Sequence, residues 1–158
     1  MSKPSFVYVT YIASSPGKVW AALTKPDLTE QYWFGYRVAA DGKAGDRMTA
    51  FSPAGKQAHN DPIIESDPPH RLVYAWKPLY KDMDNERPSR VTFELEPFKD
   101  QTRLTVVHDE FDDDSKIFGM ISQGWPAVLS SLKSFLETGR GLPSSWDEEV
   151  AQRAAAEA

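Results

Sequence analysis

One stretch near the end of the chain constrains the fold more than any other. Between Lys116 and Thr138, apolar residues recur every three or four positions and form one stripe on a helical wheel. The stripe consists of Ile117, Ile121, Trp125, Val128, Leu132 and Phe135, widened by Phe118, Leu129 and Leu136. A helix of this length must bury such a stripe against a large apolar partner. The sequence therefore predicts a long core helix over residues 116–138.

This helix carries its own stop signal and its own weak points. Gly139 follows the last apolar pair and favours a helix end there. Three residues inside the helix weaken it: Gly119, Gly124 and Pro126. We therefore expect a bend near Pro126. The segment Ile117–Trp125 would then form a tilting lid, and Val128–Leu136 would form fixed core.

The residues before the helix alternate between apolar and polar in short segments, which is typical of strands. Strands are expected at Phe6–Ile12, Tyr36–Ala39, Asp46–Phe51, His59–Ser66, Arg71–Trp76, Ser89–Glu96 and Thr102–Glu110. Pro62 interrupts one of them and indicates a bulge or an edge position. Because short turns separate the later strands, we expect them to follow one another as an antiparallel meander.

Two short helices are expected between the first and second strands. Ser15 is a good N-cap and Pro16 suits the first helical position, and this helix must stop before Pro26. A second helix is expected over residues 27–34, ended by Gly35. The order of elements predicts an α+β fold, in which a curved seven-stranded antiparallel sheet wraps around the long C-terminal helix.

Composition narrows the class of protein. A chain of 158 residues suits one domain, expected over residues 1–142, with a frayed tail helix in residues 143–158. The formal charge of -5 gives no basic surface for nucleic acid. The chain has no cysteine, so it has no disulfide or thiolate chemistry. No apolar run is long enough to insert into a membrane, and we expect a cytoplasmic protein.

The three histidines are the main candidates for chemistry. His59, His70 and His108 lack the spacing of a metal site, so we expect no metal and no cofactor. Alternation turns His108 inward with Leu104 and Val106. A hydrogen-bonded structural histidine is the preferred interpretation, with a ligand contact or a general base as alternatives. No partner for catalysis can be named, so no catalytic residue is assigned.

A further set of residues is aimed at the space between sheet and helix by strand alternation and helical period. These candidate cavity-lining residues are Tyr8, Tyr74, Trp76, Phe93, His108, Ile117, Ile121 and Trp125. Apolar periodicity alone does not distinguish a filled core from a pocket wall. Both interpretations therefore stay open at this point.

Several segments resemble the heat-shock-protein-90 ATPase activator homologue family, which belongs to the START and birch-pollen-allergen superfamily (SRPBCC). The resemblance rests on residues 12–16 (IASSP) with 19–24 (VWAALT), 67–76 (DPPHRLVYAW), 91–96 (VTFELE) and 124–126 (GWP) with Leu129 and Leu132. It covers about residues 5–140 in order. It implies a helix-grip fold, in which the sheet grips the C-terminal helix around a deep apolar cavity.

The resemblance implies function less directly, because superfamily members bind lipids, hormones or polyketides and only a minority are cyclases or hydrolases. The first hypothesis is a binding protein for a hydrophobic, aromatic or lipid-like small molecule. The alternative is a co-chaperone-like interaction module, acting through the outer sheet face or the loop at residues 77–88, with a homodimer also possible for the family. The third is an enzyme that uses His108 as a general base.

Overall fold

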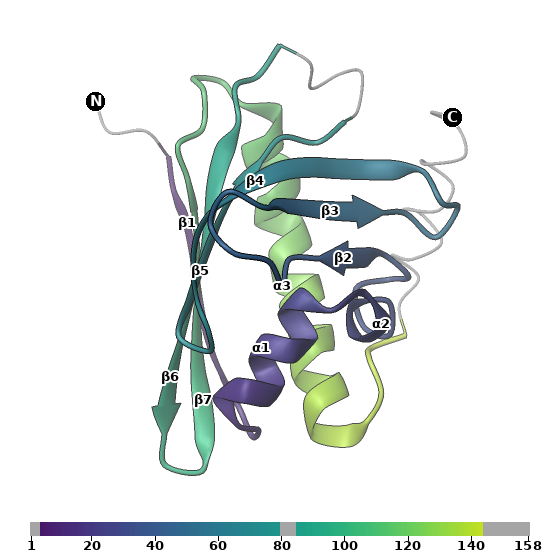
Figure 1. Ribbon diagram of the computed structural model, residues 1–158, viewed down its shortest axis with the longest axis vertical. Helices are drawn as coiled ribbons and strands as arrows, with labels where there is room; N and C mark the ends of the chain where they lie inside the picture. The colour runs from purple at the N-terminus through teal and green to yellow at the C-terminus, as the bar shows by residue number, and fades with distance from the viewer. Residues whose placement is uncertain (1–3, 80–84, 144–158) are drawn as a thin grey trace.

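The computed structural model describes residues 4–79 and 85–143. Within them, the chain forms β1 (Phe6–Ile12), α1 (Pro16–Thr24), α2 (Pro26–Thr29), β2 (Arg37–Ala39), β3 (Arg47–Phe51), β4 (Gln57–Asp67), β5 (Arg71–Trp76), β6 (Ser89–Phe98), β7 (Gln101–Asp109) and α3 (Lys116–Thr138). The seven strands form one antiparallel sheet in the order β1-β7-β6-β5-β4-β3-β2. Figure 1 shows this sheet curling around α3. The predicted α+β architecture is confirmed.

The sheet changes direction along β4, which pairs with different neighbours in its two halves. Residues 57–62 pair with β3, and Ile63–Asp67 pair with β5. The register with β5 shifts between Ile63 and Glu65, directly after Pro62. A bulge increases local bending and twist, which lets one strand serve both parts of a curled sheet. The predicted bulge is therefore confirmed, whereas an edge position for β4 is wrong.

The long helix α3 begins and ends where the sequence predicts. The Ser115 hydroxyl accepts a hydrogen bond from the Phe118 N–H at 3.2 Å, as an N-cap does. At the other end, Gly139 adopts a φ of 88° and donates its N–H to the Phe135 carbonyl at 2.8 Å. The helix is continuous across Pro126. A bend at that residue stays a prediction.

The second short helix is shorter than predicted. We expected residues 27–34, but α2 ends at Thr29. The Thr29 hydroxyl lies 2.9 Å from the Tyr36 carbonyl and accepts the Val38 N–H at 2.8 Å, so contacts with the start of β2 compete with further helix. Phe34 and Gly35 have positive φ values of 51° and 83° and turn the chain toward β2.

The remaining boundaries agree closely with the sequence. The ends of the strands lie within two residues of their predicted positions. The Ser15 side chain caps α1 by accepting the Lys18 N–H at 3.3 Å, as expected. Residues 144–158, which include the expected tail helix, lie outside the described residues. Among the described residues, no helix has both the length and the apolar character needed to span a bilayer.

Burial of the α3 stripe predicts a clear stability difference between two positions on this helix. Leu132 is fully buried, so Leu132→Ala should lower the free energy of unfolding by about 2–5 kcal/mol. Met120 is 44% exposed, so Met120→Ala should change it by about 0.5 kcal/mol or less. Urea denaturation of both variants measures the two values, and equal losses would contradict this account of the core.

Candidate functional site

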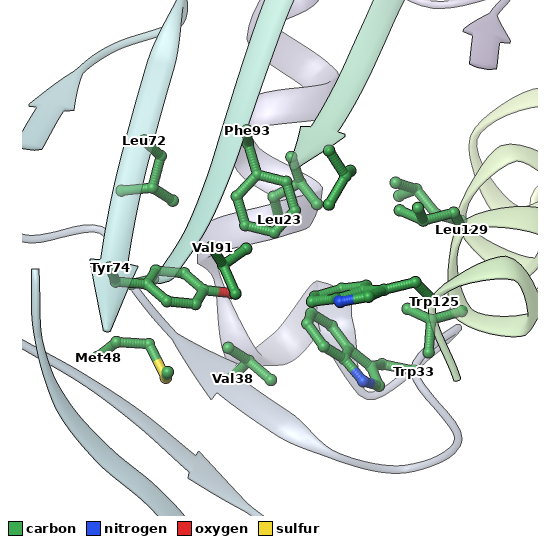
Figure 2. Packing of buried hydrophobic residues seen from close by; sticks show 14 of the residues in the cluster. Leu23, Trp33, Val38, Met48, Leu72, Tyr74, Val91, Phe93, Trp125 and Leu129 are labelled. Carbon is green, nitrogen blue, oxygen red and sulfur yellow. The ribbon is translucent and has the colours of Figure 1, made fainter. Parts of the chain in front are cut away.

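The inner face of the sheet carries a group of polar side chains among aromatic rings. Strands β4 to β7 contribute them, and α3 covers them with Trp125. The aromatic and polar side chains concerned are His59, Asp61, Tyr74, Trp76, Ser89, Phe93, His108 and Trp125. Figure 2 shows Tyr74, Phe93 and Trp125 within the hydrophobic core. Polar groups in such surroundings need partners, so their hydrogen bonds indicate what the site can do.

Five of the predicted cavity-lining residues come together as one ring cluster. Trp125 lies at ring-centroid distances of 5.4 Å from Trp76, 5.8 Å from Phe93 and 6.2 Å from His108. Tyr74 lies 5.7 Å from Phe93 and 6.3 Å from Trp76. These are ordinary distances for edge-to-face and offset aromatic pairs. Residues far apart in the sequence thus form one aromatic wall.

The other three predicted residues occupy different surroundings. Ile117 and Ile121 are buried within the core on α3. Tyr8 is half-buried and stacks on Phe6 at a centroid distance of 6.4 Å. A ligand-contacting role for the eight residues stays a prediction.

A chain of hydrogen bonds runs through the ring cluster. The Trp125 Nε1–H donates to His108 Nδ1 at 3.0 Å. Because Nδ1 accepts, the imidazole proton must be on Nε2, which donates to Ser89 Oγ at 2.7 Å. The Ser89 hydroxyl in turn donates to the Trp76 carbonyl at 3.1 Å. We call this chain the core relay, and it links α3 to β7, β6 and β5.

His108 is held neutral within this relay. Its side chain is fully buried, and burial together with the nearby His59 lowers its pKa from 6.5 to about 3. Both of its ring nitrogens already have partners. These bonds favour the structural interpretation of His108 over a general base, which would need a free nitrogen.

Tyr74 differs from His108 because its polar atom makes no hydrogen bond with the described residues. Its side chain is fully buried, and its hydroxyl has no hydrogen-bond partner among the described residues. Figure 2 shows the ring extending from β5, with the hydroxyl on the side of the core toward Trp125. Burial, and secondarily the Asp61 carboxylate, raise the Tyr74 pKa, so the phenol keeps its proton. An unpartnered buried hydroxyl costs about 1–3 kcal/mol.

A buried pair of polar side chains on β4 was not predicted from the sequence. His59 Nδ1 lies 2.9 Å from Asp61 Oδ2, and both side chains are 7% exposed. The same carboxylate oxygen accepts the Lys77 N–H at 3.2 Å. The His59 ring lies 4.1 Å from the ring of Trp76. Two residues spaced i, i+2 share one strand face, so the His-x-Asp pattern is the signal that could have revealed the pair.

The position of His108 predicts a distinctive pH dependence. Between pH 6.5 and about 3, the unfolded chain binds a proton that folded His108 does not, so the free energy of unfolding falls as pH falls. The slope from this group reaches about 1.4 kcal/mol per pH unit. His108→Gln can keep both hydrogen bonds but does not titrate, so its curve should be flatter across this window. Urea denaturation at several pH values measures the difference, and parallel curves would contradict it.

Solved structures with the same fold include proteins from several organisms. The protein MLL2253 from Mesorhizobium loti is 26% identical, with a TM-score of 0.71 over 85% of this chain and 97% of that chain. The Aha1 dimer from Colwellia psychrerythraea is 21% identical, with a TM-score of 0.71 over 87% and 99%. PFC0360w, an HSP90 activator from Plasmodium falciparum, is 20% identical, with a TM-score of 0.67 over 84% and 96%.

Family membership comes from the sequence itself, since low identities to solved structures show only the fold. None of the curated proteins matches the chain. A family model matches residues 13–137, which span α1 through nearly all of α3 and include every residue of the core relay. The chain therefore belongs to the family described as Activator of Hsp90 ATPase homolog 1-like protein.

Proposed function

We propose that the chain binds a hydrophobic, aromatic or lipid-like small molecule between its sheet and α3. The observation that carries the proposal is the Tyr74 hydroxyl, which is fully buried and unpartnered among the described residues. A ligand oxygen that accepted a hydrogen bond from this hydroxyl would remove the cost of leaving it unpaired. The aromatic neighbours Trp76, Phe93 and Trp125 offer flat apolar surfaces for the rest of such a molecule.

The polar groups of the core relay already have hydrogen-bond partners, so the Tyr74 hydroxyl is the group expected to orient the ligand. The core relay occupies both nitrogens of His108 and uses the Ser89 hydroxyl as donor and acceptor. It also occupies the indole N–H of Trp125. Among the described residues, the Tyr74 hydroxyl is a buried donor of this site without a partner, and such a placed polar group in an apolar site fixes the orientation of a ligand.

Access to this site requires part of the structure to move, because the ring cluster is closely packed. Gly119 and Gly124 lie in the first half of α3, and a Cβ added to either would meet no atom within 4 Å. Packing therefore does not require glycine at these positions, although each weakens the helix by about 1 kcal/mol relative to alanine. These residues support the hypothesis that Ile117–Trp125 acts as a lid, whose opening would break the Trp125–His108 hydrogen bond until the lid closes again.

Tyr74→Phe removes the hydroxyl and keeps the ring. For 2-acetylnaphthalene, which has a carbonyl acceptor, the variant should bind about tenfold more weakly than the unaltered protein. For 2-ethylnaphthalene, which lacks the acceptor, both proteins should bind equally. Quenching of tryptophan fluorescence measures the four affinities, since two tryptophans line the site.

The same variant also tests whether the hydroxyl is truly unpaired in the free protein. Its midpoint of thermal unfolding should be equal to or above that of the unaltered protein, because no hydrogen bond is lost. A marked destabilisation, or the absence of binding of either naphthalene, would contradict the proposal.

A second function, contact with an Hsp90-type chaperone, is favoured by the outer face of the sheet at β1. Three exposed apolar side chains lie on β1, namely Val7 at 58%, Val9 at 42% and Tyr11 at 40%, and a fourth, Phe98 at 46%, lies at the end of β6. Tyr11 and Phe98 lie 5.3 Å apart between ring centroids. Grouped exposed apolar residues are typical of interaction surfaces. Membership of the family named for the activator supports this candidate.

Substitution on this outer face distinguishes the second function from the first. If the chain stimulates the ATPase of an Hsp90-type chaperone, Val9→Glu should reduce the stimulation about tenfold, because it places a charge within the apolar group. Ile64→Glu is the matched control, since Ile64 is 51% exposed on another strand. Steady-state ATPase assays measure the effect. Equal stimulation by both variants would exclude this face as the contact.

A further inference from the structure

The buried pair of His59 and Asp61 has a polar atom that the fold does not use. The carboxylate accepts hydrogen bonds from His59 Nδ1–H and from the Lys77 N–H. With Nδ1 as the donor, the second ring nitrogen, Nε2, carries a lone pair in the neutral imidazole. The described residues give Nε2 no hydrogen bond. A carboxylate that orients an imidazole and leaves its other nitrogen free is the arrangement of a proton acceptor.

This free nitrogen belongs to the same surroundings as the free Tyr74 hydroxyl. Trp76 contacts both rings, at 4.1 Å from His59 and 6.3 Å from Tyr74. Asp61 is near enough to Tyr74 that its charge raises the tyrosine pKa. An unpaired donor, the phenol of Tyr74, and an unpaired acceptor, Nε2 of His59, thus belong to two rings that contact the same indole ring.

We propose that His59 accepts the proton of an acidic hydroxyl on the bound molecule, so that the site selects aromatic phenols or enols. This inference rests on the proposed small-molecule function and narrows its ligand class. A purely apolar ligand would leave the buried Tyr74 hydroxyl without a partner, which is unfavourable, and would not use the lone pair of His59 Nε2. A hydroxyaryl molecule with a second oxygen satisfies both groups.

The proton transfer is balanced within the site. The O–H bond of the ligand breaks, its electron pair stays on oxygen, and the proton forms a bond to His59 Nε2. The products are a phenolate or enolate and an imidazolium. The Asp61 carboxylate stabilises the new imidazolium through the existing 2.9 Å contact. The neutral, fully hydrogen-bonded His108 adds no second positive charge.

The nitrophenol chromophore reports this transfer directly. 4-Nitrophenol absorbs at different wavelengths as the phenol and as the phenolate, and 4-nitroanisole is the same molecule with a methyl group in place of the acidic proton. At about one pH unit below the pKa of free 4-nitrophenol, about a tenth of the free probe is ionised. Saturating protein should raise the ionised fraction at least threefold. The anisole should bind with no such band.

Matched histidine variants assign the effect to one residue. His59→Gln should abolish the rise in the phenolate fraction. His70→Gln, which removes an exposed histidine elsewhere in the chain, should leave the rise unchanged. If His59→Gln does not fold, ¹⁵N-histidine NMR of the unaltered protein gives the same answer. The nitrogens of His59 should then shift toward the protonated form with 4-nitrophenol and stay unchanged with 4-nitroanisole.

The outcomes separate this inference from the function on which it rests. Binding of both probes without a rise in phenolate, or with an equal rise in His59→Gln, overturns the proton-accepting role and leaves the small-molecule function standing. The absence of binding of either probe overturns both.

Discussion

The hydrogen bond from the indole of Trp125 to His108 is the contact on which the interior of this protein depends. A helix that packs on a sheet through apolar groups alone can slide or rotate with little penalty, whereas a buried polar contact is satisfied in one arrangement only. Here the contact continues through Ser89 to the backbone of Trp76, so the core relay fixes α3 against three strands. Trp76, Phe93 and Trp125 consequently meet as one aromatic wall.

The relay also determines which polar atoms remain for other purposes. The relay gives both ring nitrogens of His108 a hydrogen-bond partner, and burial lowers the pKa of this histidine so that it stays neutral. Outside the relay, the Tyr74 hydroxyl is buried without a partner among the described residues, and the second nitrogen of His59 makes no hydrogen bond with them. Proteins rarely leave a buried hydroxyl unpaired without a functional reason. The proposed ligand site follows from this contrast between His108, whose nitrogens both have partners, and the Tyr74 hydroxyl, which has none among the described residues.

Much of the fold could be predicted because its signals are local. The helical period and the following Gly139 predicted both ends of α3. The alternation of apolar and polar residues predicted the seven strands and indicated that Tyr74 and His108 point inward. Tertiary contacts decided the rest. Thr29 ends α2 early by bonding to residues at the start of β2, and β4 buries Ala58 and His59 in succession, which breaks simple alternation. Alternation shows which face a side chain occupies, but it does not show its partner, so the pairing of His59 with Asp61 required the structure.

A crystal structure of the complex with 2-acetylnaphthalene tests the central claim most directly, because it locates the partner of the Tyr74 hydroxyl. The account predicts the probe between the sheet and α3, with its carbonyl oxygen at hydrogen-bond distance, about 2.5–3.0 Å, from the Tyr74 oxygen. It also predicts that the bonds of His108 to Trp125 and Ser89 persist. A probe bound on the outer face of the sheet, or a Tyr74 hydroxyl bonded to another group of the protein, would contradict it.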